Sequence, residues 1–139
     1  MEYTEWEQGS KDLVWSNIVC RDNGIFSPRF SNAYFKELNN ELIGFQDITK
    51  NLYRELSEMV HGNNSTWNSE NPKIELKPDL RQKYQAYIEI MSKILNFGFS
   101  LKYLKKFNDG EKEQIETYIS ASIGHINNIR KELGGPTDE

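Results

Sequence analysis

Residues 38–62 read LNNELIGFQDITKNLYRELSEMVHG, and this stretch decides the fold class of the 139-residue chain. Apolar side chains recur in it at intervals typical of one face of an α-helix. This apolar face consists of Leu38, Phe45, Ile48, Leu52, Leu56 and Met59. The pattern predicts a long amphipathic helix over residues 31–60, with Gly44 as a candidate bend and His61-Gly62 as its C-terminal signal.

One further helix is predicted before this one in the sequence, and one after it. A short helix opens with Ser10 as its N-cap and stops at Asn23-Gly24. A longer helix has Pro78 in its first turn and runs toward Phe107, with residues 96–98 as a candidate break. Its expected core face is Leu80, Tyr84, Tyr87, Met91 and Ile94.

A last helix is predicted after the turn at residues 108–110. Gly134-Gly135 provide its C-terminal signal, because glycine readily adopts the left-handed conformation that ends helices. Its expected core face is Ile115, Tyr118, Ile119, Ser122, Ile123, Ile126, Ile129 and Leu133.

No segment alternates apolar and polar side chains as a strand does. Amphipathic helices bury their apolar faces against one another, so the sequence predicts an all-α fold, an antiparallel up-and-down bundle of four to five helices. Residues 1–139 are expected to form one domain. Residues 62–76 are predicted to form a long polar loop, and residues 1–9 and 134–139 are expected to be loosely ordered.

Composition excludes several classes of protein. The single Cys20 allows no disulfide within the chain and no zinc site built from cysteines. No stretch approaches the ~18–20 apolar residues of a membrane span, and the N-terminus lacks the basic and apolar segments of a signal peptide. These features favour a cytoplasmic protein without a membrane partner. A net charge of −4 argues against indiscriminate nucleic-acid binding.

Positive charge is concentrated in the middle of the chain. Residues 61–109 carry eight Lys and Arg against five Asp and Glu, whereas the segments before and after them are acidic. Tyr84, Tyr87 and Tyr103 lie among these basic residues. Such interleaving suits a nucleic-acid groove, and it equally suits a solvated helix face with tyrosines in the core.

Four polar side chains fall together on the side of helix 31–60 opposite its predicted core face. They are Lys50, Arg54, Ser57 and His61. Arg54 and His61 are two helical turns apart, which corresponds to about 10 Å along the axis. A neutral imidazole transfers protons near pH 7 and a guanidinium group binds phosphate oxygens. The pair therefore suits phosphodiester cleavage without a metal ion.

The run LYRELSEMVHG over residues 52–62 resembles the signature of the HEPN family (higher eukaryotes and prokaryotes nucleotide-binding domain). In that signature an Arg precedes a His by four to six residues near the end of a helix, and here Arg54 and His61 are separated by six. Many active members carry Asn, Asp or His directly after the Arg, where this chain has Glu55. The resemblance implies a small α-helical bundle that dimerises. Two Arg/His motifs then face each other and form one metal-independent endoribonuclease site.

These observations predict an endoribonuclease that needs no metal and no cofactor and acts as a homodimer. Arg54 and His61 are the expected catalytic residues, and Lys50, Tyr53 and Ser57 are expected to position the RNA substrate. The resemblance implies a role of the kind that family members have in toxin–antitoxin pairs and in phage defence. Attack by the ribose 2′-hydroxyl group would make RNA the substrate and leave DNA uncut.

Other interpretations of the same residues remain open. One is a non-catalytic HEPN-like module that binds a protein partner, such as a cognate antitoxin. Another is a helical domain of a longer enzyme. In a purely structural role, Arg54 would form an ion pair with Glu58 one turn away, and His61 would interact with the dipole at the helix end.

Overall fold

The computed structural model describes residues 15–60 and 78–136, and every regular element within these ranges is a helix. This confirms the all-α class. The α-helices are α2 (Trp15–Ile18), α3 (Pro28–Tyr34), α4 (Leu42–Val60), α6 (Pro78–Tyr103), α7 (Asp109–Ile123) and α8 (Asn127–Glu132). Two short 3₁₀ helices, η1 (Lys36–Glu41) and η2 (Leu104–Lys106), join neighbouring elements.

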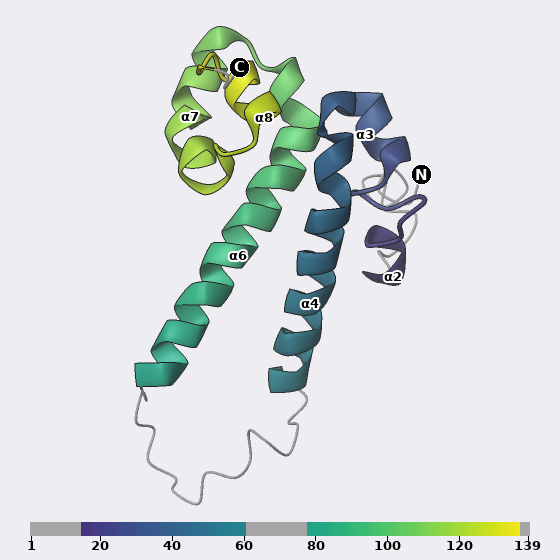
Figure 1. The fold of residues 1–139 in the computed structure, drawn as a ribbon, viewed down its shortest axis with the longest axis vertical. Coiled ribbons are helices and arrows are strands. Elements are labelled where there is room, and N and C mark those ends of the chain that lie inside the picture. Colours follow the sequence, from purple (N-terminus) through teal and green to yellow (C-terminus); the bar gives the residue numbers. More distant parts are fainter. Residues whose placement is uncertain (1–14, 61–77, 137–139) are drawn as a thin grey trace, which may run out of the picture.

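The two long helices α4 and α6 lie side by side and run in opposite directions (Figure 1). At one end of this pair, α3 packs beside the first turns of α4, and α7 and α8 lie against the last turns of α6. The first turns of α6 are less buried than its last turns, and residues 81–86 are all exposed. No helix in the described ranges has the length and apolar character needed to cross a bilayer.

The core lies at the end of the molecule where the short helices gather. Phe45 of α4 stacks on Phe97 of α6 with ring centroids 3.7 Å apart and planes only 3° from parallel. Phe26, just before α3, packs against both rings. The other members of this buried cluster are Phe35, Leu38, Leu42, Leu101, Leu104, Ile119, Ile123, Ile126 and Ile129. Aromatic contacts therefore join α4 and α6 near the place where α3 meets them.

The predicted helix over residues 31–60 is divided in the structure. It begins earlier, at Pro28, because the Ser27 hydroxyl oxygen caps it by accepting a hydrogen bond from the backbone N–H of Phe30. It then breaks at Phe35, which leaves the helical conformation and buries its ring. The buried Ser31 hydroxyl group donates a 2.8 Å hydrogen bond to the carbonyl oxygen of Phe35. The same carbonyl oxygen also accepts a hydrogen bond from the backbone N–H of Leu38 in η1, so the acceptor stays satisfied although the helix does not continue.

The other predicted boundaries are partly confirmed. The α4 helix ends at Val60 and α6 begins at Pro78, as predicted, and α6 continues through residues 96–98 without the candidate break. The first helix ends at Ile18, before the predicted stop. The predicted last helix is divided at Gly124 into α7 and α8. Its predicted end is correct, because Gly134 has a φ of +86° and closes the last turn.

The core face predicted for the helix over residues 31–60, which the structure divides between η1 and α4, is correct in part. Leu38, Phe45 and Leu52 are buried, Leu56 is half-buried, and Ile48 is 37% exposed. The side chain of Met59 lies outside the described residues. Leu42, Gln46 and Thr49 are buried on this face as well.

Two buried polar groups of α4 have backbone partners. The Gln46 amide group donates a 2.7 Å hydrogen bond to the Phe26 carbonyl oxygen, and the Thr49 hydroxyl group donates one of 2.6 Å to the Phe45 carbonyl oxygen. These bonds allow the two polar side chains to be buried on the core face.

The predicted core face of α6 is wrong at two positions. Tyr87 is buried as expected, but Tyr84 and Met91 are 51% and 41% exposed. The buried apolar residues that follow Tyr87 at helical spacing are Phe97 and Leu101 of α6 and Leu104 of η2. On α7, Tyr118 was also expected in the core and is 74% exposed. The predicted loop over residues 62–76 and the expected loose order of residues 1–9 fall outside the described part of the chain, as does the end of the expected loose segment 134–139 from residue 137 on.

Candidate functional site

Three of the predicted site residues share one side of α4. Lys50, Arg54 and Ser57 fall within about 60° of one another around the helix. Arg54 is exposed, and Lys50 and Ser57 are half-buried. Leu52, on the core face, lies about 160° from Arg54 around the same helix. The guanidinium group of Arg54 is therefore available at the surface rather than buried between helices. We call Lys50, Arg54 and Ser57 the α4 polar row.

The remaining predicted site residues lie beside or beyond this row. Tyr53 is 46% exposed and adjoins Ser57 around the helix. His61 follows Val60, the last residue of α4, and lies outside the described residues. The structure thus places Arg54 near the C-terminal end of a long helix but gives no distance between Arg54 and His61.

Arg54 makes no ion pair within the described part of the chain. The ion pair with Glu58, which a purely structural role suggests, is absent between these two described residues. A guanidinium group has five N–H donors, and its planar shape matches the oxygens of a phosphate. Arg54 is therefore suited to bind an anion at the surface.

Glu55, directly after Arg54, points to a different neighbour. Its Oε2 atom accepts a 2.8 Å hydrogen bond from the hydroxyl group of Tyr87 on α6. Glu55 lies 100° further around α4 than Arg54, so its carboxylate faces the other long helix. The residue at which the chain differs from many HEPN members is thus used in a contact between α4 and α6.

Lys83 completes a small polar group at this contact. Its Nζ atom lies 5.6 Å from the centroid of the Tyr87 ring. Burial raises the pKa of the Tyr87 hydroxyl group, and its hydrogen bond to Glu55 raises the pKa further. The pKa of Lys83 is also raised, chiefly by its interaction with Tyr87 and then by the nearby charges of Glu55 and Glu58. Lys83 itself lowers the pKa of Tyr87, but burial and the bond to Glu55 outweigh this effect and favour the protonated tyrosine.

A second arginine lies near the α4 polar row. Arg21, in the connection between α2 and α3, forms a 3.5 Å ion pair with Asp47 of α4. Both side chains are more than half exposed, so the pair contributes little to stability. Its position matters more, because Asp47 and Arg54 are two turns apart on the same side of α4. Arg21 was not predicted as a site residue, because no local pattern in the sequence marks it.

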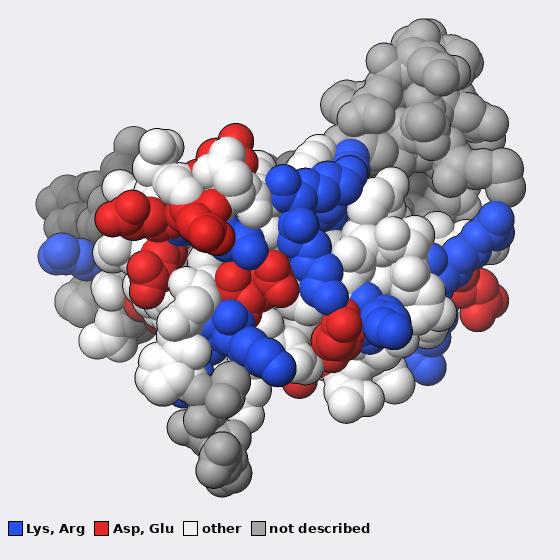
Figure 2. Space-filling model, turned by 90° about the horizontal axis from the view of Figure 1, so that it is seen from above, with Lys and Arg blue, Asp and Glu red and all other residues white. Residues whose placement is uncertain are grey.

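The basic and aromatic residues near the end of α6 contact one another. Lys105 lies 4.5 Å above the ring of Phe35, and Lys106 lies 5.0 Å above the ring of Tyr34. Lys105 also donates a 2.7 Å hydrogen bond to Glu37, which lowers the pKa of that carboxyl group. Figure 2 shows the end of the molecule where α6 terminates, with Lys and Arg side chains across the middle of the face. Lys102 and Lys106 also lie over the ring of Tyr103, 4.9 and 6.0 Å from its centroid. Because lysines cover Tyr103, this ring is less suited to stacking with nucleic-acid bases than the sequence pattern suggests.

In the described ranges, no three His, Cys, Asp or Glu side chains come close enough together to hold a metal ion. The chain matches no known family model, and comparisons with curated proteins and with solved structures find no similar protein.

Proposed function

We propose that the protein is an HEPN-like endoribonuclease that cleaves RNA without a metal ion or cofactor. The observation that supports this proposal best is the position of Arg54. Its side chain is exposed near the C-terminal end of α4, and it has no carboxylate partner in the described ranges. The resemblance to the HEPN signature supplies the second residue, His61, seven positions further along the chain.

In the proposed reaction, Arg54 binds a non-bridging phosphate oxygen and offsets negative charge that develops in the transition state. His61 takes the proton from the ribose 2′-hydroxyl group or gives a proton to the departing 5′-oxygen. Lys50, Tyr53 and Ser57 hold the substrate in place. The 2′-oxygen then forms a bond to phosphorus as the bond to the 5′-oxygen breaks. The products carry a 2′,3′-cyclic phosphate and a 5′-hydroxyl group.

Two proton transfers are required, and one Arg/His pair offers a single imidazole. We therefore propose a homodimer in which the polar rows of two copies face each other across a two-fold axis. A stable dimer should bury on the order of 800 Å² per copy. The proposed setting is a cytoplasmic toxin or phage-defence effector, in which a cognate antitoxin could act as a protein partner.

The experiment is RNA cleavage by the purified protein in the presence of EDTA, with the ends of the products analysed. The expected result is metal-independent cleavage that leaves 2′,3′-cyclic phosphate ends, with DNA uncut. His61→Ala should lower the rate by about 10²–10⁴-fold, as expected for a general acid or base. Arg29→Ala, which removes an exposed guanidinium group from α3, should leave the rate unchanged.

The proposal fails if the wild-type protein leaves RNA intact at every pH between about 6 and 8, the range in which an imidazole titrates. It also fails if His61→Ala cleaves as fast as the wild-type protein. Either result would favour a second candidate function, a non-catalytic HEPN-like module that binds a protein partner. The exposed apolar side chains of α6 favour this second candidate.

A further inference from the structure

Five large apolar side chains on α6 form a continuous exposed stripe. They are Tyr84, Ile88, Met91, Leu95 and Phe99, with exposed fractions between 37% and 64%. The intervals between them are four, three, four and four residues, so all five lie on one face of the helix. This spacing resembles that of helices that pack against another helix along a seam. We call these five residues the α6 stripe.

The α6 stripe is large enough to bind a protein segment. With about half of each side chain exposed, the five together present on the order of 500 Å² of apolar surface. The largest apolar patch on a monomer typically covers about 300–600 Å², and patches of that size are often functional. Along the helix axis the stripe measures about 22 Å, or four turns.

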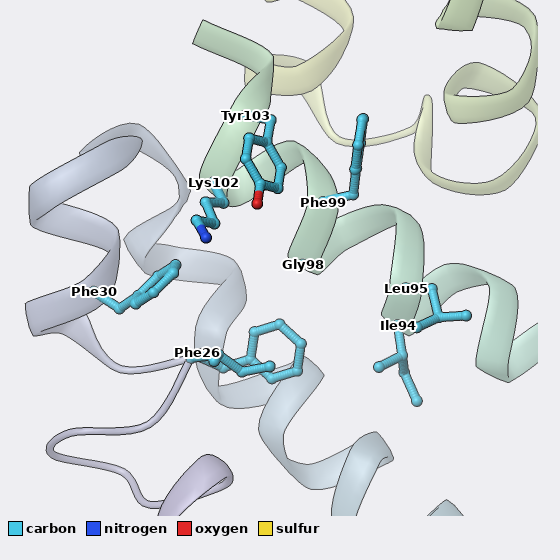
Figure 3. Close-up of a pocket in the computed structure, with 9 residues that line it drawn as sticks. Phe26, Phe30, Ile94, Leu95, Gly98, Phe99, Lys102 and Tyr103 are labelled. Carbon is cyan, nitrogen blue, oxygen red and sulfur yellow. The ribbon is translucent and has the colours of Figure 1, made fainter. Parts of the chain in front are cut away.

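An open apolar pocket adjoins one end of the stripe. Leu95 and Phe99 of the stripe belong to its lining, and Phe26 and Phe30 come from the segment around α3. Figure 3 shows Phe30 facing the side chains of Lys102 and Tyr103 across this pocket. The lining is almost entirely apolar. A side chain projecting from a segment bound along the stripe could therefore be buried here.

Each end of the α6 stripe carries a positive charge on the same face of the helix. Arg81 precedes Tyr84 by three residues, and Lys102 follows Phe99 by three. The carboxylate of Glu89 is the single negative side chain between these two positions in the sequence, and it lies about 100° from Ile88 around the helix. The face is thus apolar along its length and basic at both ends.

This charge pattern opposes the pairing of two copies along the stripe. In an antiparallel pair centred near Met91, Arg81 of one copy would lie beside Lys102 of the other. In a parallel pair in the same register, each cation would lie beside its own counterpart. Like charges in contact across an interface disfavour association. The pattern instead complements a segment with acidic residues at both ends.

We infer that the α6 stripe and the adjoining pocket bind an amphipathic helix of a partner protein, with acidic residues flanking its apolar anchors. The anchors would occur at intervals of three and four residues, as in other helices that lie in apolar grooves. This inference is independent of the ribonuclease proposal, because the α6 stripe and the α4 polar row lie on different helices.

The probe for this inference is a labelled synthetic peptide of about 21 residues, long enough as a helix to reach from Arg81 to Lys102. It carries Leu at the anchor positions and two Glu residues at each end, and its binding is followed by fluorescence anisotropy. Leu95→Glu should weaken binding at least about tenfold, because it places a charge in the centre of the apolar contact. Ala86→Glu adds the same charge at an exposed position on the opposite side of α6 and should have no effect.

Charge reversal provides a second test. Arg81→Glu should weaken binding of the Glu-ended peptide by about threefold and strengthen binding of a matched peptide with Lys at its ends. Lys93→Glu makes the same charge change at an exposed position on the opposite side of α6 and should alter neither. Circular dichroism of each variant should match that of the wild-type protein.

Several outcomes would overturn the inference. One is a failure of the wild-type protein to bind the Glu-ended peptide. Another is equal binding of a scrambled peptide of the same composition, which would mean that apolar content alone is recognised. A third is a dimer of the protein alone that Leu95→Glu dissociates in sedimentation experiments, which would assign the stripe to a second copy.

Discussion

The hydroxyl group of Tyr87 on α6 donates a 2.8 Å hydrogen bond to Oε2 of Glu55 on α4. These residues are 32 positions apart in the sequence. They meet beyond the stacked rings of Phe45 and Phe97, toward the ends of the long helices that join residues 61–77. The contact therefore fixes the register of α4 against α6 outside the main core. It also keeps the carboxylate that follows Arg54 away from the α4 polar row.

Tyr87→Phe should lower the free energy of unfolding by about 1 kcal/mol, the typical net contribution of one hydrogen bond. The ring and its packing are retained, so the change reports the hydroxyl group alone. Urea denaturation measures the effect. Tyr84→Phe, on the same helix but 51% exposed, should change the unfolding free energy by less than about 0.5 kcal/mol. Equal effects of the two substitutions would mean that the bond to Glu55 does not stabilise the fold.

Alkaline pH should weaken the same contact. The pKa of Tyr87 is raised in the folded state, so its contribution to stability is present below the pKa of an unfolded tyrosine, about 10. That contribution is lost as the pH rises through the higher folded pKa, and the raised pKa of Lys83 acts in the same direction. Urea denaturation between about pH 9 and pH 11 should show a smaller loss of stability for Tyr87→Phe than for the wild-type protein. A parallel decline in both proteins would contradict this assignment.

Leu52→Ala should destabilise the protein by roughly 2–5 kcal/mol, because Leu52 is buried on the core face of α4. Ile48→Ala removes an apolar side chain of similar size one turn earlier. Since Ile48 is 37% exposed, its loss leaves less of a cavity, and the cost should be at most about half as large. Thermal or urea unfolding of both variants compares the two positions. If Ile48→Ala lowers the free energy of unfolding more than Leu52→Ala does, α4 turns a different face to the core than the structure shows.

Gly44→Ala should stabilise the protein by about 0.5–1 kcal/mol. Gly44 lies inside α4, and an added Cβ atom would meet no atom within 4 Å. Alanine has the higher helix propensity, chiefly because glycine loses more backbone entropy on folding. Gly24→Ala should have the opposite effect, since its Cβ atom would collide with the Ile18 carbonyl oxygen and lie 2.6 Å from that of Cys20. Melting temperatures of the two variants should therefore move in opposite directions.

Arg54→Ala should lower the rate of RNA cleavage by about 10²–10³-fold, through loss of the group that stabilises charge on the phosphate. Arg54→Lys should restore only part of the activity, because an ammonium group cannot bind phosphate oxygens through a planar pair of donors. Both variants should unfold within about 0.5 kcal/mol of the wild-type protein, since Arg54 is exposed. A drop in stability that matches the drop in activity would indicate a structural role for Arg54.

The sequence alone determined the all-α class and the helix boundaries that depend on local chemistry. Pro78 opens α6 because proline suits the first turn of a helix, and Gly134 ends the last helix in the left-handed conformation. The end of α4 at Val60 was predicted from the His61-Gly62 signal, and the grouping of Lys50, Arg54 and Ser57 on one side follows from helical periodicity. Each of these features involves residues within a few positions of one another.

Only the tertiary structure decided which face of α6 is buried. One face carries Tyr87, Phe97 and Leu101, and another carries the α6 stripe, and both have helical spacing. Periodicity cannot choose between them, because the choice depends on where α4 and α7 pack. The burial of the Phe35 ring and the bond from Tyr87 to Glu55 have the same origin. They arise from contacts between segments that are distant in the sequence, whose free energy exceeds the small local preferences of the chain.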